Sequence, residues 1–209
     1  MKDFLVEKID GKLSLISKLH PEFQPICIDF LSTEMKRKKL GAATSKDLLI
    51  KAVGAVKERP KILDCTLGLG TDSFLLQARG CEMWACERNE ILRQLWKDAA
   101  SRAKLTTIQF QEMDAKEFLT STKEIFDCIY LDPMYPEEKR KSAQKKEMVV
   151  LRELLGSDPD ADALLALALE KAKKRVVVKR PLQGKIIGTK TPSLRLKGKA
   201  VRFDVYLNI

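Results

Sequence analysis

The sequence has no long apolar run and no recognisable signal-peptide pattern. Its longest apolar stretch, Ala163 to Leu169, is well short of the roughly 18 residues that a membrane-spanning helix needs. The first residues, Met1-Lys2-Asp3-Phe4, lack the pattern of a signal peptide. These absences predict a cytoplasmic protein without a membrane partner.

Metal ligands are also scarce. The chain has one histidine, His20, and its five cysteines include no C-x-x-C pair. Structural zinc sites take four Cys or His ligands, usually at such close spacings. We therefore expect no bound metal, and reduced, buried thiols at Cys27, Cys65, Cys81, Cys86 and Cys128.

Acidic residues are few in the last third of the chain. Residues 139–199 contain 17 Lys and Arg but 6 Asp and Glu, whereas the whole chain contains 39 and 29. Because cations that neutralise phosphates release condensed counterions, such a block favours a polyanionic partner. A solubilising face is the alternative. A second cluster, Lys36 to Lys39, supports the polyanion if the fold brings the two together.

The order of strand and helix patterns predicts the fold class. From Lys61 onward these patterns alternate, which is typical of a mostly parallel sheet with helices on both faces. A terminal antiparallel hairpin suits a class I methyltransferase (Rossmann-like) α/β fold better than a dehydrogenase. The expected strands are 62–65, 82–86, 107–110, 127–131 and 175–179, the helices 72–78, 90–103, 146–155 and 160–173, and the hairpin 193–196 with 201–207.

Residues 1–59 form a small N-terminal extension in this interpretation, and residues 60–209 the catalytic domain. A β-hairpin is expected around Asp10-Gly11. A short strand, Ile26 to Phe30, follows it. A helix from Lys46 to Val56 is expected next, with Ser45 or Thr44 as its cap.

A glycine turn follows the first strand of the catalytic domain. Gly68 and Gly70 let the backbone bend sharply and approach a ligand. Glu87 ends the next strand at roughly the twenty-residue offset of an acid that binds ribose hydroxyls. Together they predict a nucleotide-type cofactor, although a plain tight turn would explain the glycines alone.

The loop after the third strand, Asp114-Ala115, commonly frames an adenine ring in such folds. Asp114 would accept a hydrogen bond from the exocyclic amine, and the Ala115 N–H would donate to the ring. A helix N-cap explains Asp114 equally well.

The segment Asp132-Pro133-Met134-Tyr135-Pro136 ends the fourth strand, where open α/β sheets bind ligands. An exocyclic amine on a base is a poor nucleophile, because its lone pair is delocalised into the ring. The Asp132 carboxylate and the Pro133 carbonyl can accept from such an amine and orient it, and Tyr135 can stack on the base. A strand exit whose Asp caps the next helix is the alternative.

At these residues the chain resembles the bacterial 16S ribosomal RNA (guanine-1516 N2) methyltransferases, a class I family that uses S-adenosylmethionine. The resemblance runs from about Ile26 to Tyr206. Six segments carry it in order: Leu63 to Asp72, Cys86 to Asn89, Tyr130 to Pro136, Lys145 to Met148, Asp158 to Asp162 and Arg175 to Pro181. Thr71 and the segment 41–46 depart from the family pattern, since many members carry Arg in place of Thr71 and a glycine-rich segment at 41–46.

The resemblance implies methyl transfer from S-adenosylmethionine to the N2 of a guanine in small-subunit ribosomal RNA, free or in the 30S subunit. It implies cofactor contacts from Thr71, Asp72, Glu87, Arg88, Asp114, Ala115 and Asp132, beside the glycine turn of Gly68 and Gly70. Asp132 would orient the amine and Tyr135 would stack the base. The RNA phosphates are expected to contact Lys145, Lys146, Lys179 and Arg180.

Three other functions remain open from sequence. A nicotinamide-dependent oxidoreductase shares the glycine turn and the ribose acid, but it has no use for the loop at Asp132. A non-enzymatic RNA-binding assembly factor would need neither Asp132 nor Tyr135. Within the enzyme class, adenine N6 or a protein amide is another planar amine that suits the same loop.

Overall fold

The computed structural model describes residues 3–42, 47–134 and 146–208. Its main sheet has seven strands in the order β6-β5-β4-β7-β8-β10-β9. Strands β4 to β8 run parallel, and β10 pairs antiparallel with β8 and β9. The strands are β4 (Lys61–Asp64), β5 (Glu82–Cys86), β6 (Ile108–Gln111), β7 (Phe126–Leu131), β8 (Ala172–Pro181), β9 (Leu194–Lys197) and β10 (Val201–Leu207). The predicted α/β class is confirmed, with its parallel sheet and terminal hairpin.

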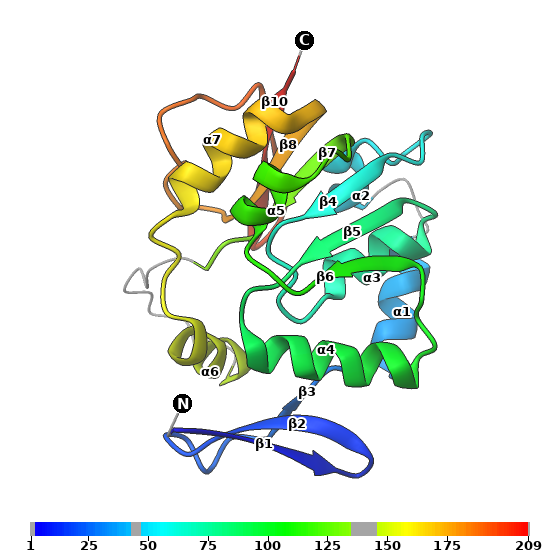
Figure 1. Cartoon of the computed structure of the whole chain (residues 1–209), viewed down its shortest axis with the longest axis vertical. Helices are drawn as coiled ribbons and strands as arrows, with labels where there is room; N and C mark the ends of the chain where they lie inside the picture. Colours follow the sequence, from blue (N-terminus) through cyan, green and yellow to red (C-terminus); the bar gives the residue numbers. More distant parts are fainter. Residues whose placement is uncertain (1–2, 43–46, 135–145, 209) are drawn as a thin grey trace.

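Helices cover both faces of this sheet (Figure 1). Side chains alternate between faces along a strand, so Ile129 packs with one set of helices and Tyr130 with the other. The helices on the Ile129 face are α5 (Ala115–Ser121) and α7 (Ala161–Lys171); those on the Tyr130 face are α2 (Leu48–Val53), α3 (Thr71–Ala78) and α4 (Glu90–Arg102).

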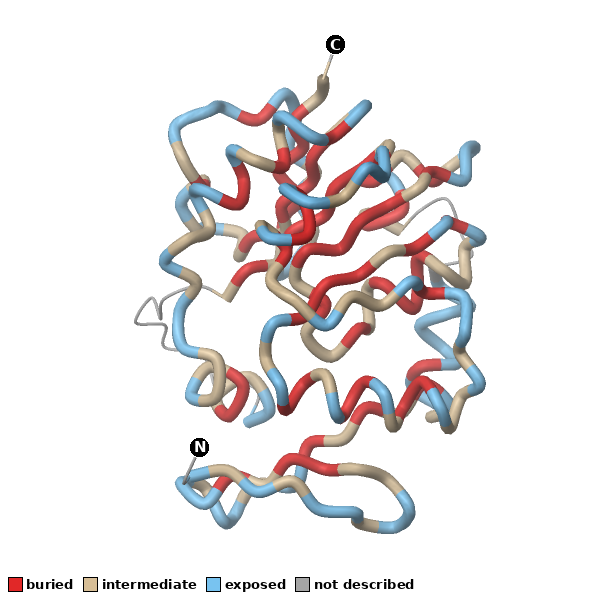
Figure 2. Tube along the Cα trace, in the orientation of Figure 1, coloured by how far each residue is buried: buried red, intermediate tan, exposed pale blue. Residues whose placement is uncertain are grey.

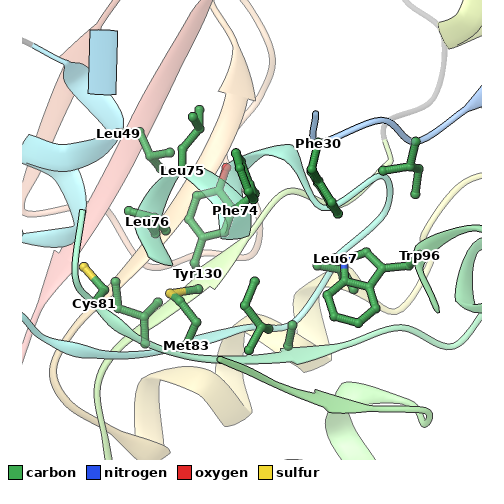
Figure 3. Packing of buried hydrophobic residues seen from close by; sticks show 14 of the residues in the cluster. Phe30, Leu49, Leu67, Phe74, Leu75, Leu76, Cys81, Met83, Trp96 and Tyr130 are labelled. Atoms are coloured by element: carbon green, nitrogen blue, oxygen red, sulfur yellow. The ribbon is translucent and has the colours of Figure 1, made fainter. Parts of the chain in front are cut away.

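The core on the Tyr130 face extends from the sheet to the N-terminal segment. Figure 3 shows Phe30 on one side of Phe74, with Leu75 and Tyr130 on the other. The Phe30 and Phe74 rings stack with centroids 4.7 Å apart. Phe74 belongs to the first turn of α3, so this stack fixes the segment around Phe30 against the start of that helix.

The N-terminal residues form a separate three-stranded antiparallel sheet, β1 (Phe4–Ile9), β2 (Lys12–Ser17) and β3 (Ile26–Cys27). Figure 1 shows it beside α4. The Leu13 N–H donates to Asp98 of α4 at 3.1 Å. The buried Leu15 belongs to the same apolar cluster as Ile62 of the seven-stranded sheet. The predicted hairpin at Asp10-Gly11 joins β1 to β2, with both turn residues at positive φ. The division at residue 60 stays a prediction.

Helix α1 (Thr33–Ala42), which contains the basic segment Lys36 to Lys39, was not predicted, and two local predictions were wrong. The strand expected from Ile26 to Phe30 ends at Cys27. The next helix, α2, begins at Leu48, because the Asp47 side chain caps it and accepts from Leu49 N at 2.8 Å. The two cap residues expected from sequence, Thr44 and Ser45, lie outside the described residues.

The last α/β unit differs in length from its prediction. Helix α7 ends two residues early, at Lys171, because the chain enters β8 at Ala172. Strand β8 then runs for ten residues, to Pro181, alongside both β7 and β10. The remaining helix is α6 (Lys146–Leu155). Across the described residues, we find no helix with the length and apolar character needed to cross a membrane.

Gly70 provides a test of how tightly the turn is packed. Its φ is +72°, and a Cβ there would lie 2.6 Å from Nε1 of Trp96, which Figure 3 shows beside Leu67. We expect Gly70→Ala to lower the free energy of unfolding by about 2 kcal/mol or more, because it adds left-handed strain to overpacking. Gly41→Ala is the control, since a Cβ at Gly41 meets nothing within 4 Å. Urea unfolding measures both; equal stability of the two variants would contradict the expectation.

Candidate active site

A cavity of about 740 Å³ opens at the carboxyl ends of the parallel strands. Its walls come from the segments that follow β4, β5, β6 and β7, with α6 and the start of α7. All nine residues predicted to contact the cofactor line it: Gly68, Gly70, Thr71, Asp72, Glu87, Arg88, Asp114, Ala115 and Asp132. The structure thus brings them together, whereas their contacts with a cofactor remain predictions.

The glycine turn places the start of α3 at this cavity. Gly68 and Gly70 both have positive φ, 55° and 72°, a conformation that costs glycine little. Gly70 is the N-cap of α3, so Thr71 and Asp72 form its first turn. The partial positive charge of a helix N-terminus therefore faces the cavity beside an acidic side chain.

Glu87 is tied to two of the loops that line the cavity. Its carboxylate accepts from Gly68 N at 2.8 Å and from Asn89 N at 2.7 Å. The residue is 7% exposed, and this burial raises the pKa of the carboxyl group. A carboxylate has about four acceptor positions, so these two bonds leave capacity for the predicted ribose hydroxyls.

Arg88 joins three loops at one end of the cavity. Its guanidinium pairs with Asp114 at 3.4 Å, with Asp160 at 3.1 Å, and also with Asp158. Asp114 caps α5 as well, accepting from Lys116 N at 2.8 Å. The cap that we considered for Asp114 is therefore present, and its contact with an adenine ring stays untested.

Asp132 is held through both its backbone and its side chain. Its N–H donates to Thr66 Oγ1 at 2.6 Å, and its Oδ2 accepts from Lys179 Nζ at 2.8 Å. Burial raises the pKa of the Asp132 carboxyl group, and the Lys179 ammonium opposes that rise. The loop that follows β7 therefore starts from a fixed carboxylate.

Lys179 also binds a second carboxylate. Its ammonium donates to Asp72 Oδ2 at 2.8 Å, and the same oxygen accepts from Tyr130 Oη at 2.6 Å. Burial lowers the pKa of Lys179, but the charges of Asp132 and Asp72 outweigh it and raise the pKa overall. One ammonium thus connects β8, α3 and the end of β7.

The residues predicted to contact RNA phosphates are dispersed. Lys179 is engaged by the two carboxylates, and Arg180 is 7% exposed. Their environments argue against direct phosphate contacts. Lys146 is exposed, and its ammonium lies 5.0 Å from the centre of the Phe23 ring. Lys145 and the predicted stacking residue Tyr135 lie outside the described residues.

Two carboxylates at the site were missed from sequence. Asp158 accepts from Met134 N at 2.6 Å, and its own N–H donates to Met134 O at 3.3 Å. It therefore fixes the segment two residues after Asp132. The signal for it was its place in one of the six resembling segments, but no local pattern connects it with Met134.

Asp64, the second of these carboxylates, is 1% exposed and ends strand β4. It accepts from Ser73 Oγ at 2.6 Å and from Thr66 N at 3.0 Å. Burial nevertheless raises the pKa of Asp64 to about 7. The signal that could have identified Asp64 from the sequence is a carboxyl group in an otherwise apolar strand.

The described residues contain no group of three or more His, Cys, Asp or Glu side chains arranged to hold a metal ion. Cys65, Cys81, Cys86 and Cys128 are buried free thiols, and Cys27 is half-buried.

Comparison with known proteins identifies the family. A family model for SAM-dependent methyltransferases matches residues 2–208. The chain belongs to this family. Ribosomal RNA small subunit methyltransferase J of Coxiella burnetii is 43% identical over 190 residues, which are 88% of this chain and 75% of that protein. The protein of the same name from Hydrogenovibrio crunogenus is 39% identical over 210 residues, 95% of this chain and 75% of that one.

A solved structure shares the fold as well as the sequence. The SAM-dependent methyltransferase NGO1261 from Neisseria gonorrhoeae is 31% identical, with a TM-score of 0.70 over 94% of this chain and 79% of that chain. Membership of the family makes the protein an S-adenosylmethionine-dependent methyltransferase and separates it from the nicotinamide-dependent oxidoreductases.

The contacts of Lys179 give a prediction about pH. Replacing Lys179 by Met removes the charge that lowers the pKa of Asp132, so that pKa rises further. If methyl transfer needs ionised Asp132, the acid limb of the kcat profile moves to higher pH. Lys179→Arg is the control, because it keeps a positive charge. Single-turnover rates across pH measure the limb; a profile unchanged in the Met variant would contradict this role.

Proposed function

We propose that this methyltransferase acts on the exocyclic N2 of a guanine in 16S ribosomal RNA. The observation that carries the proposal is the position of the Asp132 carboxyl group. Asp132 follows β7, lines the cavity and is held by hydrogen bonds to Thr66 and Lys179. The names of the two relatives, ribosomal RNA small subunit methyltransferase J, support the choice of RNA. The enzyme would work in the cytoplasm on free 16S RNA or on the 30S subunit.

The cavity suits the cofactor of this family. Seven carboxyl and four cationic side chains line it, which favours a ligand that carries a sulfonium and an ammonium group. S-adenosylmethionine supplies an activated methyl group on its sulfonium. Thr71 and Asp72 would lie at the glycine turn beside it, Glu87 would accept from the ribose hydroxyls, and Asp114 with Ala115 would frame the adenine.

Asp132 would perform the chemistry on the amine. The lone pair of guanine N2 is delocalised into the ring. A carboxylate that accepts a hydrogen bond from the N2–H group would orient this lone pair toward the methyl group. Methyl transfer would form the N–C bond at N2 while the S–C bond of the methyl donor breaks, which would leave a thioether. Asp132 takes the proton that N2 loses late in this step. Because the sulfonium is already a good leaving group, the displacement needs no metal.

Several side chains would position Asp132 for this step. The Lys179 ammonium lowers the pKa of the Asp132 carboxyl group against the effect of burial, and Thr66 Oγ1 accepts from the Asp132 N–H at 2.6 Å. Asp158 fixes Met134, two residues further along the loop. Holding the nucleophile near attack distance can supply roughly 7 to 11 kcal/mol in favourable cases. Rigid support of the loop is therefore as important to the proposed rate as the carboxylate itself.

The reaction can be tested by methylating 16S RNA or 30S particles that lack the modification. We expect labelled S-adenosylmethionine to give N2-methylguanosine, identified by mass spectrometry of the digested RNA. Labelled N6-methyladenosine, or label in protein, would overturn the assigned amine. No incorporation into either substrate would overturn the assigned RNA.

Asp132→Asn tests the role of the carboxylate. We expect kcat to fall roughly 10²- to 10⁴-fold, the usual range for a lost acid–base group, while S-adenosylhomocysteine still binds by calorimetry. Asp127→Asn is the matched control, because Asp127 is half-buried near the start of β7, whereas Asp132 follows the end of that strand. Near-normal turnover in the Asp132 variant would remove it from the mechanism.

A further inference from the structure

The cavity is acidic, and this has a consequence for how RNA is held. Its seven carboxyl side chains outnumber its four cations: Asp64, Asp72, Glu87, Asp114, Asp132, Asp158 and Asp160 against Lys38, Arg88, Lys116 and Lys179. Such a charge balance attracts a cationic cofactor but repels phosphates. If the substrate is RNA, as proposed above, cations outside the cavity must hold its backbone.

Three of the four cavity cations bind carboxylates of the cavity itself, whereas the fourth, Lys38, pairs with Glu34 of its own helix. Arg88 pairs with Asp158 and Asp160, and Lys116 pairs with Asp160 at 2.6 Å. Lys179 is shared between two further carboxylates. A phosphate at any of these cations would have to displace a carboxylate, so they are poor anchors for RNA.

Part of the basic C-terminal third lies at the amino ends of the strands, on the side of the sheet away from the cavity. Lys171, Lys173 and Lys174 surround the start of β8, whereas the cavity lies at its carboxyl end. Lys174 there pairs with Glu58 at 2.9 Å and Asp127 at 3.5 Å. The charge excess in the sequence therefore does not form one surface around the site.

Helix α1 has the charge and the position that the cavity lacks. Its four consecutive cations, Lys36 to Lys39, are all exposed, and Figure 2 shows the helix pale along most of its length. Glu34 pairs with Lys38 at 2.8 Å, yet the helix keeps a net positive charge. Lys36 and Lys39, three residues apart, are neighbours on the helix surface and repel each other, so a partner that supplies negative charge there would stabilise the helix.

The same helix is anchored beside the cavity. Met35 is buried against the core, and the Lys39 ammonium lies 6.0 Å from the centre of the Phe74 ring in the first turn of α3. Lys38 itself lines the cavity. A polyanion lying along α1 would therefore pass the entrance to the site.

We propose that α1 is the docking surface for the phosphate backbone of the RNA next to the target guanine. Lys36, Arg37 and Lys39 would neutralise phosphates, and Lys38 would mark the point where the strand meets the cavity. The acidic cavity then admits only the uncharged base. These cations would bind phosphates whatever the base sequence, so specificity for guanine has to come from the cavity itself.

Two triple variants that remove equal charge test this proposal. The α1 variant combines Lys36→Gln, Arg37→Gln and Lys39→Gln, and leaves Lys38 in place so that the cavity is unaltered. The control combines Lys123→Gln, Lys171→Gln and Lys173→Gln, three exposed lysines near the amino ends of β7 and β8. Because both lower the net charge by three, any difference between them reflects location.

We measure KM for 16S RNA, its dependence on salt, and the affinity for S-adenosylhomocysteine. The α1 variant should raise KM roughly tenfold or more near 0.15 M salt and reduce the slope of log affinity against log salt by about 2, since each phosphate contact contributes about 0.7 to 0.9. Its affinity for S-adenosylhomocysteine should not change. The control should keep the KM and slope of the unaltered protein.

Equal KM and equal salt slopes in the two variants would overturn the docking surface. The single substitution Arg37→Glu is a second test. It reverses one exposed charge in the helix and should also raise KM for 16S RNA. Failure of the proposed function has a different result: the unaltered protein would then methylate neither 16S RNA nor 30S particles.

Discussion

The Lys179 ammonium lies between two carboxylates, and the arrangement of the site depends on it. Asp72 belongs to the first turn of α3 and Asp132 follows β7, and each has an oxygen 2.8 Å from this nitrogen. Without Lys179, two like charges would repel each other in a partly desolvated place. The two ion pairs thus fix the first turn of α3 against the loop that follows β7.

A second set of contacts fixes the loop that follows β7 two residues further along, at Met134. Asp158 binds the backbone of Met134 in both directions, and Arg88 binds Asp158 from the segment after β5. The loop at Asp132 is consequently connected to the loop beside the predicted ribose site. These bonds hold two segments that are distant in the sequence in one arrangement at the cavity.

Charge is divided between regions of the molecule. Carboxylates predominate in the cavity, whereas exposed cations occupy α1 beside it and the far edge of the sheet. A net charge of +10 for the chain conceals this division. An enzyme that uses a cationic cofactor and a polyanionic substrate benefits from it, because the two ligands require opposite local fields.

Most of the elements, and the sheet edge that their loops share, could be predicted from the sequence, although helix α1 could not. Strand and helix periodicity predicted the parallel sheet, and the carboxyl ends of parallel strands meet at one edge, so Gly68, Glu87 and Asp132 were expected together. The contacts between particular side chains follow from the three-dimensional fold and could not be predicted. Lys179 is near Asp132 because β7 and β8 pair with Leu131 opposite Val178, and Asp158 reaches Met134 through a loop path. Such contacts depend on register and chain path between distant residues, which local patterns do not encode.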